Sequence, residues 1–430
     1  MFVGGDRRLS FLTTRQVLSA PPTRRADERG DDDVDLRYSE AELQFRKELR
    51  EWLAKVLPEV PPEPLPHEWQ ARREWDTGWQ RRLFEAGYAG INWPTEYGGR
   101  GATLTEQLIY LEETTLAGAP YVGVNFVGTL HAGPTIMAEA SDEQKAHHLP
   151  RILRGDEVWC QGFSEPGAGS DLASLSCKGV RDGDEYVVTG QKIWTSFAQV
   201  ADMCELLIRT DPAASKHKGI TWVMCPMDLP GIEIREITTI VGSSEFSEVF
   251  FDEVRIPVVN RVGDENDGWR VAMVTFSFER GTGFISDLVE TNKMIGELAE
   301  LAQHVTRRSG TAWDDVALRR EVGRLQARMD ALWAMTKRNL AQAERDGVPG
   351  PGGSVVKIYY SELFQQMTDV AMHVLQRAGL AREDLDGYPH SGSFVEERLR
   401  SLSFSIAAGT SQIQRNIIAE RILGLPKEPK

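Results

Sequence analysis

The residues best suited to bind a ligand lie in a short glycine- and serine-rich segment, residues 162–175, with the sequence GFSEPGAGSDLASL. Gly167 and Gly169 let a backbone approach a ligand closely and adopt conformations that other residues avoid. Ser164 and Ser170 add hydroxyl groups that both donate and accept hydrogen bonds. This composition predicts a loop that cradles a cofactor, with its polar groups turned toward the ligand.

Two other structures share this glycine pattern. One is an ordinary surface turn. The other is a dinucleotide fingerprint, which needs a strand before it, a third glycine and a helix after it. Leu172 stands at the third glycine position, and residues 185–194 (EYVVTGQKIW) have the β-branched and aromatic content of strands. The sequence therefore argues against a Rossmann unit and leaves the turn and the cofactor cradle as interpretations.

Composition places the chain among soluble globular proteins. It has 430 residues, of which 41% are hydrophobic and 26% charged, enough for two or three domains. The formal net charge of -15 argues against non-specific binding to nucleic acid or anionic lipid. No apolar run reaches the roughly 18 residues of a membrane span. We expect an acidic soluble enzyme.

Cysteine and histidine usage indicates no metal site. The four cysteines show no C-x-x-C pair, so they predict neither a zinc site nor a disulfide framework, and they favour a reducing, cytoplasmic location. His147 and His148 are neighbours, and neighbours on a helix point about 100° apart, which makes a poor metal pair. We expect these two histidines to lie at the surface.

Residues 1–35 are predicted to form a disordered extension. They combine arginine pairs, Pro21-Pro22 and the acidic run 31–33, with little periodic apolar pattern. An arginine-rich start is also found in mitochondrial presequences. Such presequences are poor in acidic residues, which argues against that alternative here.

The next part of the chain, residues 36–156, is predicted to be a helical domain. Ser39 with Glu42, and Ser141 with Gln144, have the spacing of capping boxes at helix starts. Apolar residues recur at helical spacing in several segments of this domain. Helices are expected at 39–57, from Trp75 to about Gly87, and at 105–116, 131–139 and 141–149.

The character changes after this domain and changes back near residue 267. Short β-branched and aromatic runs separated by glycine turns predict a small β-barrel or sandwich over 157–262. Helical patterns over 267–426 predict a four-helix bundle. The fold class is therefore α+β multi-domain: an N-terminal α-helical domain, a central small β-barrel and a C-terminal four-helix bundle. The bundle segments are expected at 267–308, 314–345, 354–378, 393–406 and 411–423.

Four motifs in this order make the chain resemble the acyl-CoA dehydrogenase family over residues 36–426. They are 162–171 (GFSEPGAGSD), 190–196 (GQKIWTS), 278–280 (FER) and 409–415 (GTSQIQR). The resemblance implies an FAD-dependent enzyme that converts an acyl-CoA into a trans-2-enoyl-CoA. It also implies an electron-transfer flavoprotein as the acceptor and an oligomeric assembly.

The resemblance also assigns roles to residues of the first two motifs. Ser164 would bind the pyrimidine side of the flavin, Trp194 would pack against it, and Ser196 would lie near N5. Ser170 would contact the pantetheine or pyrophosphate part of the CoA thioester. It also belongs to the implied cofactor-binding set. A simpler interpretation makes Trp194 a core residue of the barrel, since tryptophan is often buried.

Other cofactor contacts implied by the resemblance come from the first motif and from the C-terminal bundle. Gln376 stands where the family places a flavin contact from a neighbouring subunit. The remaining members of the implied set are Gln161, Phe163, Gly169, Thr410 and Gln412.

The chemistry requires a carboxylate to remove the α proton of the thioester and donors to hold its carbonyl oxygen. In many relatives the carboxylate precedes the Gly-Thr-Ser-Gln motif, but Ala408 occupies that position here. Relatives of the isovaleryl and long-chain types use the glutamate of a Glu-Arg pair, which corresponds to Glu279. Arg280 would help hold substrate, and the Ala408 N–H would hold the thioester oxygen.

Glu279 lies in a largely apolar stretch, 271–285, where burial would raise its pKa toward that of a base working near neutral pH. A simpler interpretation makes Glu279 and Arg280 a structural ion pair. Ala408 also keeps open a catalytically silent or half-site subunit. An acyl-CoA oxidase on the same fold is a further alternative.

A second departure from the family lies at residues 306–313 (TRRSGTAW). They offer Arg307 and Arg308 but lack the Phe-Gly of the family's flavin-binding turn. Either arginine could substitute, or the flavin contact across the dimer differs. This leaves open both a homo-oligomer and a heteromer of paired, non-identical chains.

Overall fold

A computed structural model describes residues 38–65, 67–279, 285–346 and 350–427, without the side chains at 278, 279, 343, 344 and 346. The chain from Ala41 onward forms one compact unit, which contains all predicted site residues. The extension predicted for residues 1–35 lies outside the described residues. Every helix in the described ranges is too short or too polar to cross a lipid bilayer.

The N-terminal part of this unit is helical, and two of its helices, α4 and α6, begin at capping boxes. Ser141 caps α6 with the predicted box, its side chain accepting from the Gln144 N–H while the Gln144 side chain binds the Ser141 N–H. Thr103 and Glu106 form an equivalent box at the start of α4. The helices are α2 (Glu40–Val56), α3 (Trp69–Glu85), α4 (Leu104–Leu116), α5 (Gly133–Glu139) and α6 (Asp142–Arg154).

The central part is one eight-stranded mixed sheet. Its path runs β6-β7-β3-β2-β4-β5-β8, and β1 pairs with β4. The two halves of the path meet at a single parallel pairing, Lys178 with Arg209. The strands are β1 (Trp159–Gly162), β2 (Lys178–Asp182), β3 (Glu185–Ser196), β4 (Met203–Arg209), β5 (Ile220–Pro226), β6 (Ile232–Ile237), β7 (Phe246–Pro257) and β8 (Arg261–Val262).

Both halves of this sheet face one apolar core. Tyr186 and Val188 of β3 alternate inward with the period of a strand, and Leu206 of β4 and Val223 of β5 meet them from the other half. All four cysteines are buried free thiols. The sheet therefore wraps around its own core, as expected for the predicted β domain.

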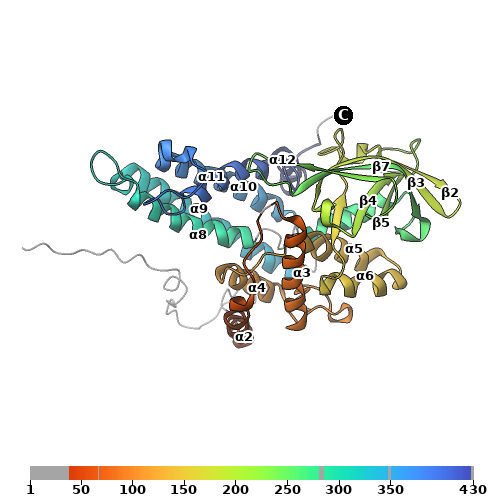
Figure 1. The fold of residues 1–430 in the computed structure, drawn as a ribbon, viewed down its shortest axis with the longest axis horizontal. Coiled ribbons are helices and arrows are strands. Elements are labelled where there is room, and N and C mark those ends of the chain that lie inside the picture. Colours follow the sequence, from red (N-terminus) through yellow and green to blue (C-terminus); the bar gives the residue numbers. More distant parts are fainter. Residues whose placement is uncertain (1–37, 66, 280–284, 347–349, 428–430) are drawn as a thin grey trace, which may run out of the picture. The chain divides into compact units, whose positions relative to one another are not determined.

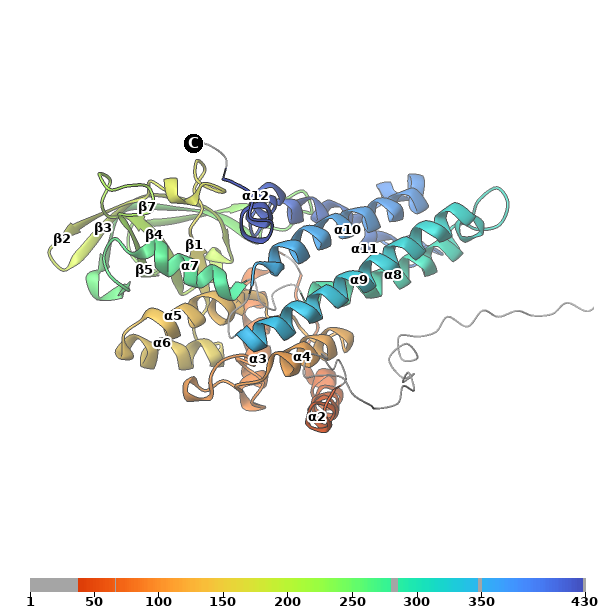
Figure 2. The same ribbon diagram turned by 180° about the vertical axis from the view of Figure 1, so that it is seen from behind.

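The C-terminal part is a helical bundle. Figures 1 and 2 show α8, α9 and α10 side by side, and buried side chains of α8, α9, α10 and α11 form one core. The helix expected at 267–308 is two helices, and the residues between them lie outside the described ranges. The elements are α7 (Gly268–Glu279), α8 (Ile285–His304), α9 (Val316–Asp346), α10 (Gly352–Leu375), α11 (Ser391–Ser401) and α12 (Ser411–Ile417).

Candidate active site

The glycine- and serine-rich segment, residues 162–175, is held against β3 by a buried ion pair; we call it the cofactor loop. Lys192 is fully buried, and its Nζ donates to Glu165 Oε1 at 2.8 Å and to the Phe163 carbonyl at 3.2 Å. The Glu165 carboxylate also accepts from the N–H groups of Ser176 and Cys177. Sequence reasoning missed this clamp.

A second contact brings the first two motifs together. The Ile193 N–H donates to the Ser164 carbonyl at 2.9 Å. This places the cofactor loop beside the β3 segment that carries Trp194 and Ser196. The sequence did contain a signal for this clamp. Lys192 is separated from Tyr186 and Val188 by even numbers of residues, so strand alternation places its side chain on the same inward-facing side.

Trp194 occupies a strained and exposed position. The β3–β7 register shifts between Lys192 and Thr195, a bulge of the kind that redirects side chains. Trp194 has a φ of 60°, a conformation that costs a non-glycine residue about 1–3 kcal/mol. Its side chain is 55% exposed, with an edge contact to Phe246. The alternative that Trp194 is a core residue is therefore wrong.

The two loop glycines differ from the prediction in one respect. Neither Gly167 nor Gly169 has a positive φ, so the backbone does not need glycine for its conformation. A Cβ added at either residue would meet no atom within 4 Å. Open space therefore lies over both residues, and close approach of a ligand is the remaining reason for glycine.

Gln161 and Phe163 lead into the loop from β1 and point away from the β core. The Gln161 amide donates to Glu205 Oε1 at 2.7 Å and contacts His131 Nδ1 at 3.2 Å. Burial lowers the pKa of His131 to about 4, so the imidazole is neutral near pH 7. Phe163 is buried, and its ring meets Phe276 of α7 edge-on, with centroids 5.8 Å apart.

Helix α7 carries the predicted base. It packs on α5 through the hydroxyls of Thr275 and Thr135, whose Oγ1 atoms lie 2.8 Å apart. Glu279 is the last residue of α7. Its side chain and the whole of Arg280 lie outside the described residues, as does the predicted burial of this pair.

The C-terminal motif begins at a left-handed backbone segment. Ala408 has a φ of 52° and is exposed, and its carbonyl accepts from Gln414 Nε2 at 3.0 Å. The Thr410 hydroxyl caps α12 by accepting from the Ile413 N–H. Gln412 is exposed. Within the described ranges, no hydrogen bond joins this motif to the cofactor loop.

The remaining predicted contacts lie at the end of α10. Gln376 follows that helix with a φ of 52° and an exposed side chain. The Arg307 guanidinium donates to the Val374 carbonyl at the same helix end. Arg307 is therefore engaged within the chain, whereas Arg308 is exposed.

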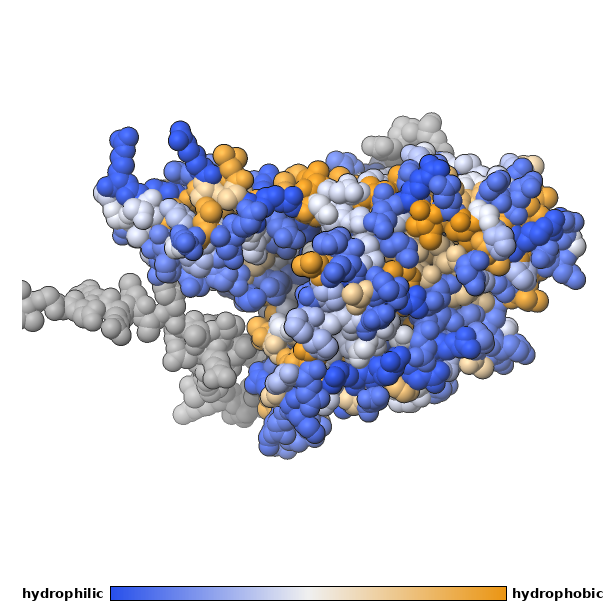
Figure 3. Space-filling view, viewed as in Figure 1, coloured by the Kyte–Doolittle hydropathy of each residue, from blue (hydrophilic) through white to orange (hydrophobic). Residues whose placement is uncertain are grey.

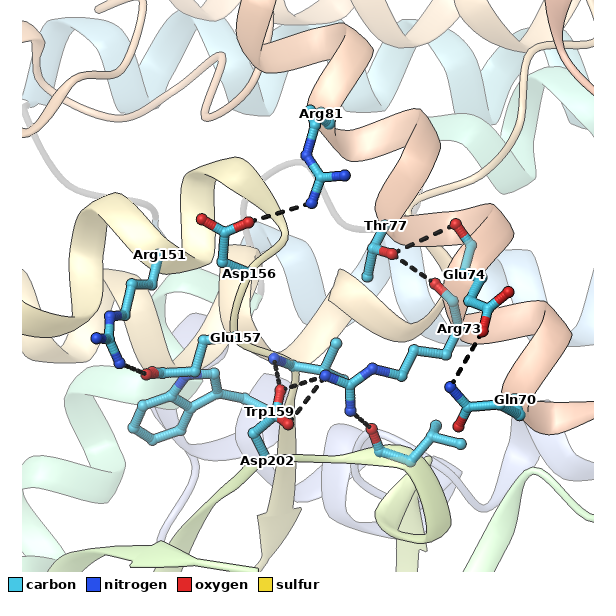
Figure 4. A network of polar contacts seen from close by, with 12 residues as sticks. Gln70, Arg73, Glu74, Thr77, Arg81, Arg151, Asp156, Glu157, Trp159 and Asp202 are labelled. Atoms are coloured by element: carbon cyan, nitrogen blue, oxygen red, sulfur yellow. Dashed lines mark hydrogen bonds and ion pairs between the residues drawn. The ribbon is translucent and has the colours of Figure 1, made fainter.

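A groove of about 1540 Å³ lies elsewhere, between α6 and the β domain. None of the predicted site residues lines it. Figure 4 shows polar contacts at its edge, among them the pair of Arg81 with Asp156 at 3.2 Å and that of Arg73 with Asp202 at 2.7 Å. These pairs join α3 to residues that flank the β strands. His147 is exposed as expected, but His148, which also lines this groove, is buried, and its Nδ1 lies 2.7 Å from Glu157 Oε1.

Three family models match nearly the whole described chain. They are the N-terminal, middle and C-terminal domains of acyl-CoA dehydrogenase, over residues 39–156, 160–254 and 266–423. The chain belongs to the acyl-CoA dehydrogenase family. It is therefore an oxidoreductase, and the resemblance of the four motifs is confirmed.

Named relatives include acyl-CoA dehydrogenases of Mycobacterium tuberculosis. IpdE1 is 38% identical over 399 residues, which covers 90% of this chain and 98% of that protein. FadE26 is 34% identical over 406 residues, covering 91% and 98%. The ChsE4-ChsE5 complex of the same organism matches with a TM-score of 0.78 and 33% identity over 92% of this chain and 100% of that one. The Tcur3481-Tcur3483 steroid ACAD matches with a TM-score of 0.79 and 31% identity, covering 92% and 100%.

Acyl-CoA dehydrogenases are flavoproteins, and the first two motifs of this chain fit such a cofactor. Trp194 offers an exposed aromatic face, and open space lies over Gly167 and Gly169. The half-buried hydroxyls of Ser164 and Ser196 make no side-chain hydrogen bond to another described residue. Donors, an aromatic platform and room for close approach therefore occur together where the cofactor loop meets the end of β3.

Proposed function

We propose that this chain dehydrogenates an acyl-CoA thioester between its α and β carbons and forms a trans-2-enoyl-CoA. FAD, when bound, supplies the hydride acceptor for this chemistry. The observation that carries the proposal is the contact of Phe276, on α7, with Phe163 of the cofactor loop. Glu279 follows Phe276 by three residues, a spacing that puts two positions on one side of a helix. Helix α7 is therefore the element suited to bring a carboxylate to the loop.

The roles proposed for the chain's own residues are those that the family resemblance implies. Glu279 takes the α proton, because Ala408 has no group that accepts one. The Ala408 N–H holds the thioester oxygen, and Arg280 helps to bind substrate. Ser170, which is exposed at the end of the glycine sequence, contacts the CoA part.

Residues that hold the cofactor are proposed in two groups. The first lies on the β domain, in and just before the cofactor loop and at the end of β3. The second lies on the C-terminal bundle. The full set is Gln161, Phe163, Ser164, Gly169, Ser170, Trp194, Ser196, Gln376, Thr410 and Gln412.

The test is the exchange Glu279→Gln, with Glu290→Gln as the matched control. Glu290 lies on α8 in a surface ion pair with Lys293 at 3.1 Å. We expect Glu279→Gln to retain bound yellow flavin but to lose anaerobic bleaching by acyl-CoA, while Glu290→Gln bleaches like wild type. Near wild-type bleaching of the Glu279→Gln protein would remove Glu279 from the mechanism.

The acyl group is proposed to be sterol-derived, because one matching structure, at 31% identity, is that of a steroid ACAD. The bleaching assay should compare sterol-derived acyl-CoA thioesters with straight-chain, branched and dicarboxylic ones. Bleaching by a straight-chain thioester in preference to sterol-derived ones would reject this choice. Electron-transfer flavoprotein is the proposed acceptor, and rapid reoxidation of reduced enzyme by oxygen would instead indicate an acyl-CoA oxidase.

An oligomer of this chain, with itself or with a paired chain, is also proposed, with a cytoplasmic location. Leu402, Ile406, Leu423 and Leu425 are large apolar residues between 44% and 67% exposed, as expected of an interaction surface. Figure 3 shows apolar side chains, in orange, interrupting the hydrophilic surface. Gel filtration with mass analysis distinguishes the two: an FAD-loaded homotetramer would exclude an obligate partner.

One further candidate is supported by Ala408, which lacks the carboxylate that many relatives carry there. In this alternative the chain is a silent or half-site subunit of a heteromer. Purified protein that stays colourless after flavin supplementation would favour it. Flavin that binds and bleaches with substrate would reject it.

A further inference from the structure

Four polar side chains form one stripe along α10. Lys357, Ser361, Gln365 and Thr368 recur at intervals of four, four and three residues, which places them on one face of the helix. Lys357, Ser361 and Thr368 are almost completely buried. We call these four residues the α10 polar stripe.

The stripe binds backbone carbonyls at and after the end of α11. Lys357 Nζ donates to the Phe404 carbonyl at 2.7 Å and to the Gly409 carbonyl at 2.9 Å. Ser361 Oγ lies within donating distance of the same Phe404 carbonyl, at 2.9 Å, and of the Lys357 carbonyl, at 2.8 Å. Gln365 Nε2 donates to the Ser401 carbonyl at 2.9 Å. The Ser401 and Phe404 carbonyls lie at the end of α11 and in the short turn after it, where carbonyls lack partners within the helix. The α10 donors therefore help to determine where the following residues lie.

The segment held in this way, residues 404–410, contains the strained part of the C-terminal motif. Ala408 and Gly409 are consecutive left-handed residues, with φ values of 52° and 84°. Glycine adopts this conformation readily, but alanine keeps it only where its surroundings impose it. Both carbonyls of this pair are held by side chains: Lys357 donates to the Gly409 carbonyl, and Gln414 donates to the Ala408 carbonyl.

We propose that Lys357 is a positioning residue for the reaction. Its buried ammonium group holds residues 404–410 so that Ala408 keeps its left-handed backbone and presents its N–H to the thioester oxygen. The inference rests on the proposed function, in which the Ala408 N–H is that contact. Lys357 acts through the backbone and does not touch substrate.

The experiment compares Lys357→Met with Lys293→Met, the same exchange at a surface ion pair of the bundle. Hydrogen exchange on the full-length protein should show at least 10-fold faster exchange at residues 402–410 in Lys357→Met, with α8 and α9 unchanged. We expect kcat to fall by about 10-fold or more, toward the 10²–10³-fold loss typical of deleting an oxyanion donor. Lys293→Met should match wild type in both measurements.

Unchanged exchange at residues 402–410 would overturn the proposal, as would faster exchange spread evenly over the bundle. If Lys357→Met does not fold, Lys357→Gln decides, because it keeps a polar side chain at this position but removes the ammonium group that donates to both the Phe404 and the Gly409 carbonyls. Faster exchange confined to residues 402–410 in that variant supports the proposal, and wild-type exchange rejects it. A wild-type protein that oxidises no acyl-CoA would refute the proposed function, while the exchange data would still test the positioning of the segment.

Discussion

The buried pair of Lys192 and Glu165 gives the sharpest test of how the cofactor loop is held. Lys192→Met keeps a long apolar side chain but removes the ammonium group. Glu165 then remains as a buried carboxylate, 7% exposed, without its cation. The N–H groups of Ser176 and Cys177 still donate to it, at 2.7 and 2.8 Å.

Breaking one side of a buried ion pair costs about 3–5 kcal/mol. The two remaining backbone donors place this case toward the lower value, because they still stabilise the charge. A cost of about 3 kcal/mol corresponds to a roughly 150-fold larger opening equilibrium, at about 1.4 kcal/mol for each factor of ten. The loss should be local, since the pair joins the cofactor loop to β3.

Amide hydrogen exchange measures this local opening without assuming that a 430-residue chain unfolds in one step. We expect the amides of Ser176, Cys177 and Ile193 to exchange about 100-fold faster in Lys192→Met. The double variant Lys192→Met/Glu165→Gln should recover most of the protection, because both charges are then absent. Exchange within about threefold of wild type in the single variant would refute the reasoning.

Three other predictions concern pH, packing and cofactor binding. Burial lowers the pKa of His131 to about 4, below its ordinary 6.5, so protons favour the unfolded chain. About 3 kcal/mol of stability should be lost as pH falls from about 6.5 to 4, and urea unfolding of His131→Leu should show a flatter pH dependence. Gly268→Ala places a Cβ 2.5 Å from the backbone nitrogen of Trp222. The substitution should displace α7 and lower both Tm and kcat. An unchanged kcat would contradict the placement of the base on α7. Trp194→Ala should lower FAD affinity about tenfold or more in flavin titrations, with little change in Tm because the side chain is 55% exposed; full flavin retention would contradict its role.

The stability of the cofactor loop should also depend on pH, through the ionisation of Glu165. Burial raises the pKa of Glu165, but the Lys192 ammonium and the Ser176 and Cys177 N–H groups lower it more, so the net pKa lies below the usual value. The carboxylate therefore stabilises the fold above the pKa of the unfolded chain. That contribution is lost as pH falls through the lower, folded-state pKa.

Helix starts and strand faces could be predicted because their causes are local. The Ser141 and Gln144 box marks α6 since both partners lie within one turn. The inward alternation of Tyr186 and Val188 follows from the period of a strand. The order of helical, β and helical parts could likewise be read from changes in period along the chain.

The cofactor loop shows where local signals stop. The register shift that turns Trp194 outward depends on how β3 pairs with β7, and the expectation of unusual backbone angles at Gly167 and Gly169 was wrong. Lys192 and Glu165 are separated by 27 residues. Neither residue alone indicates a partner at that distance.

By itself, the sequence determined the family, the order of the three structural parts and the absence of a carboxylate at Ala408. Only the tertiary structure decided which polar side chains are buried together. Lys357 meets the Gly409 carbonyl 52 residues away, and Phe163 meets Phe276 of a different domain. The physical reason is that a hydrogen bond or ring contact depends on distance in space, whereas periodicity and capping depend only on neighbours along the chain.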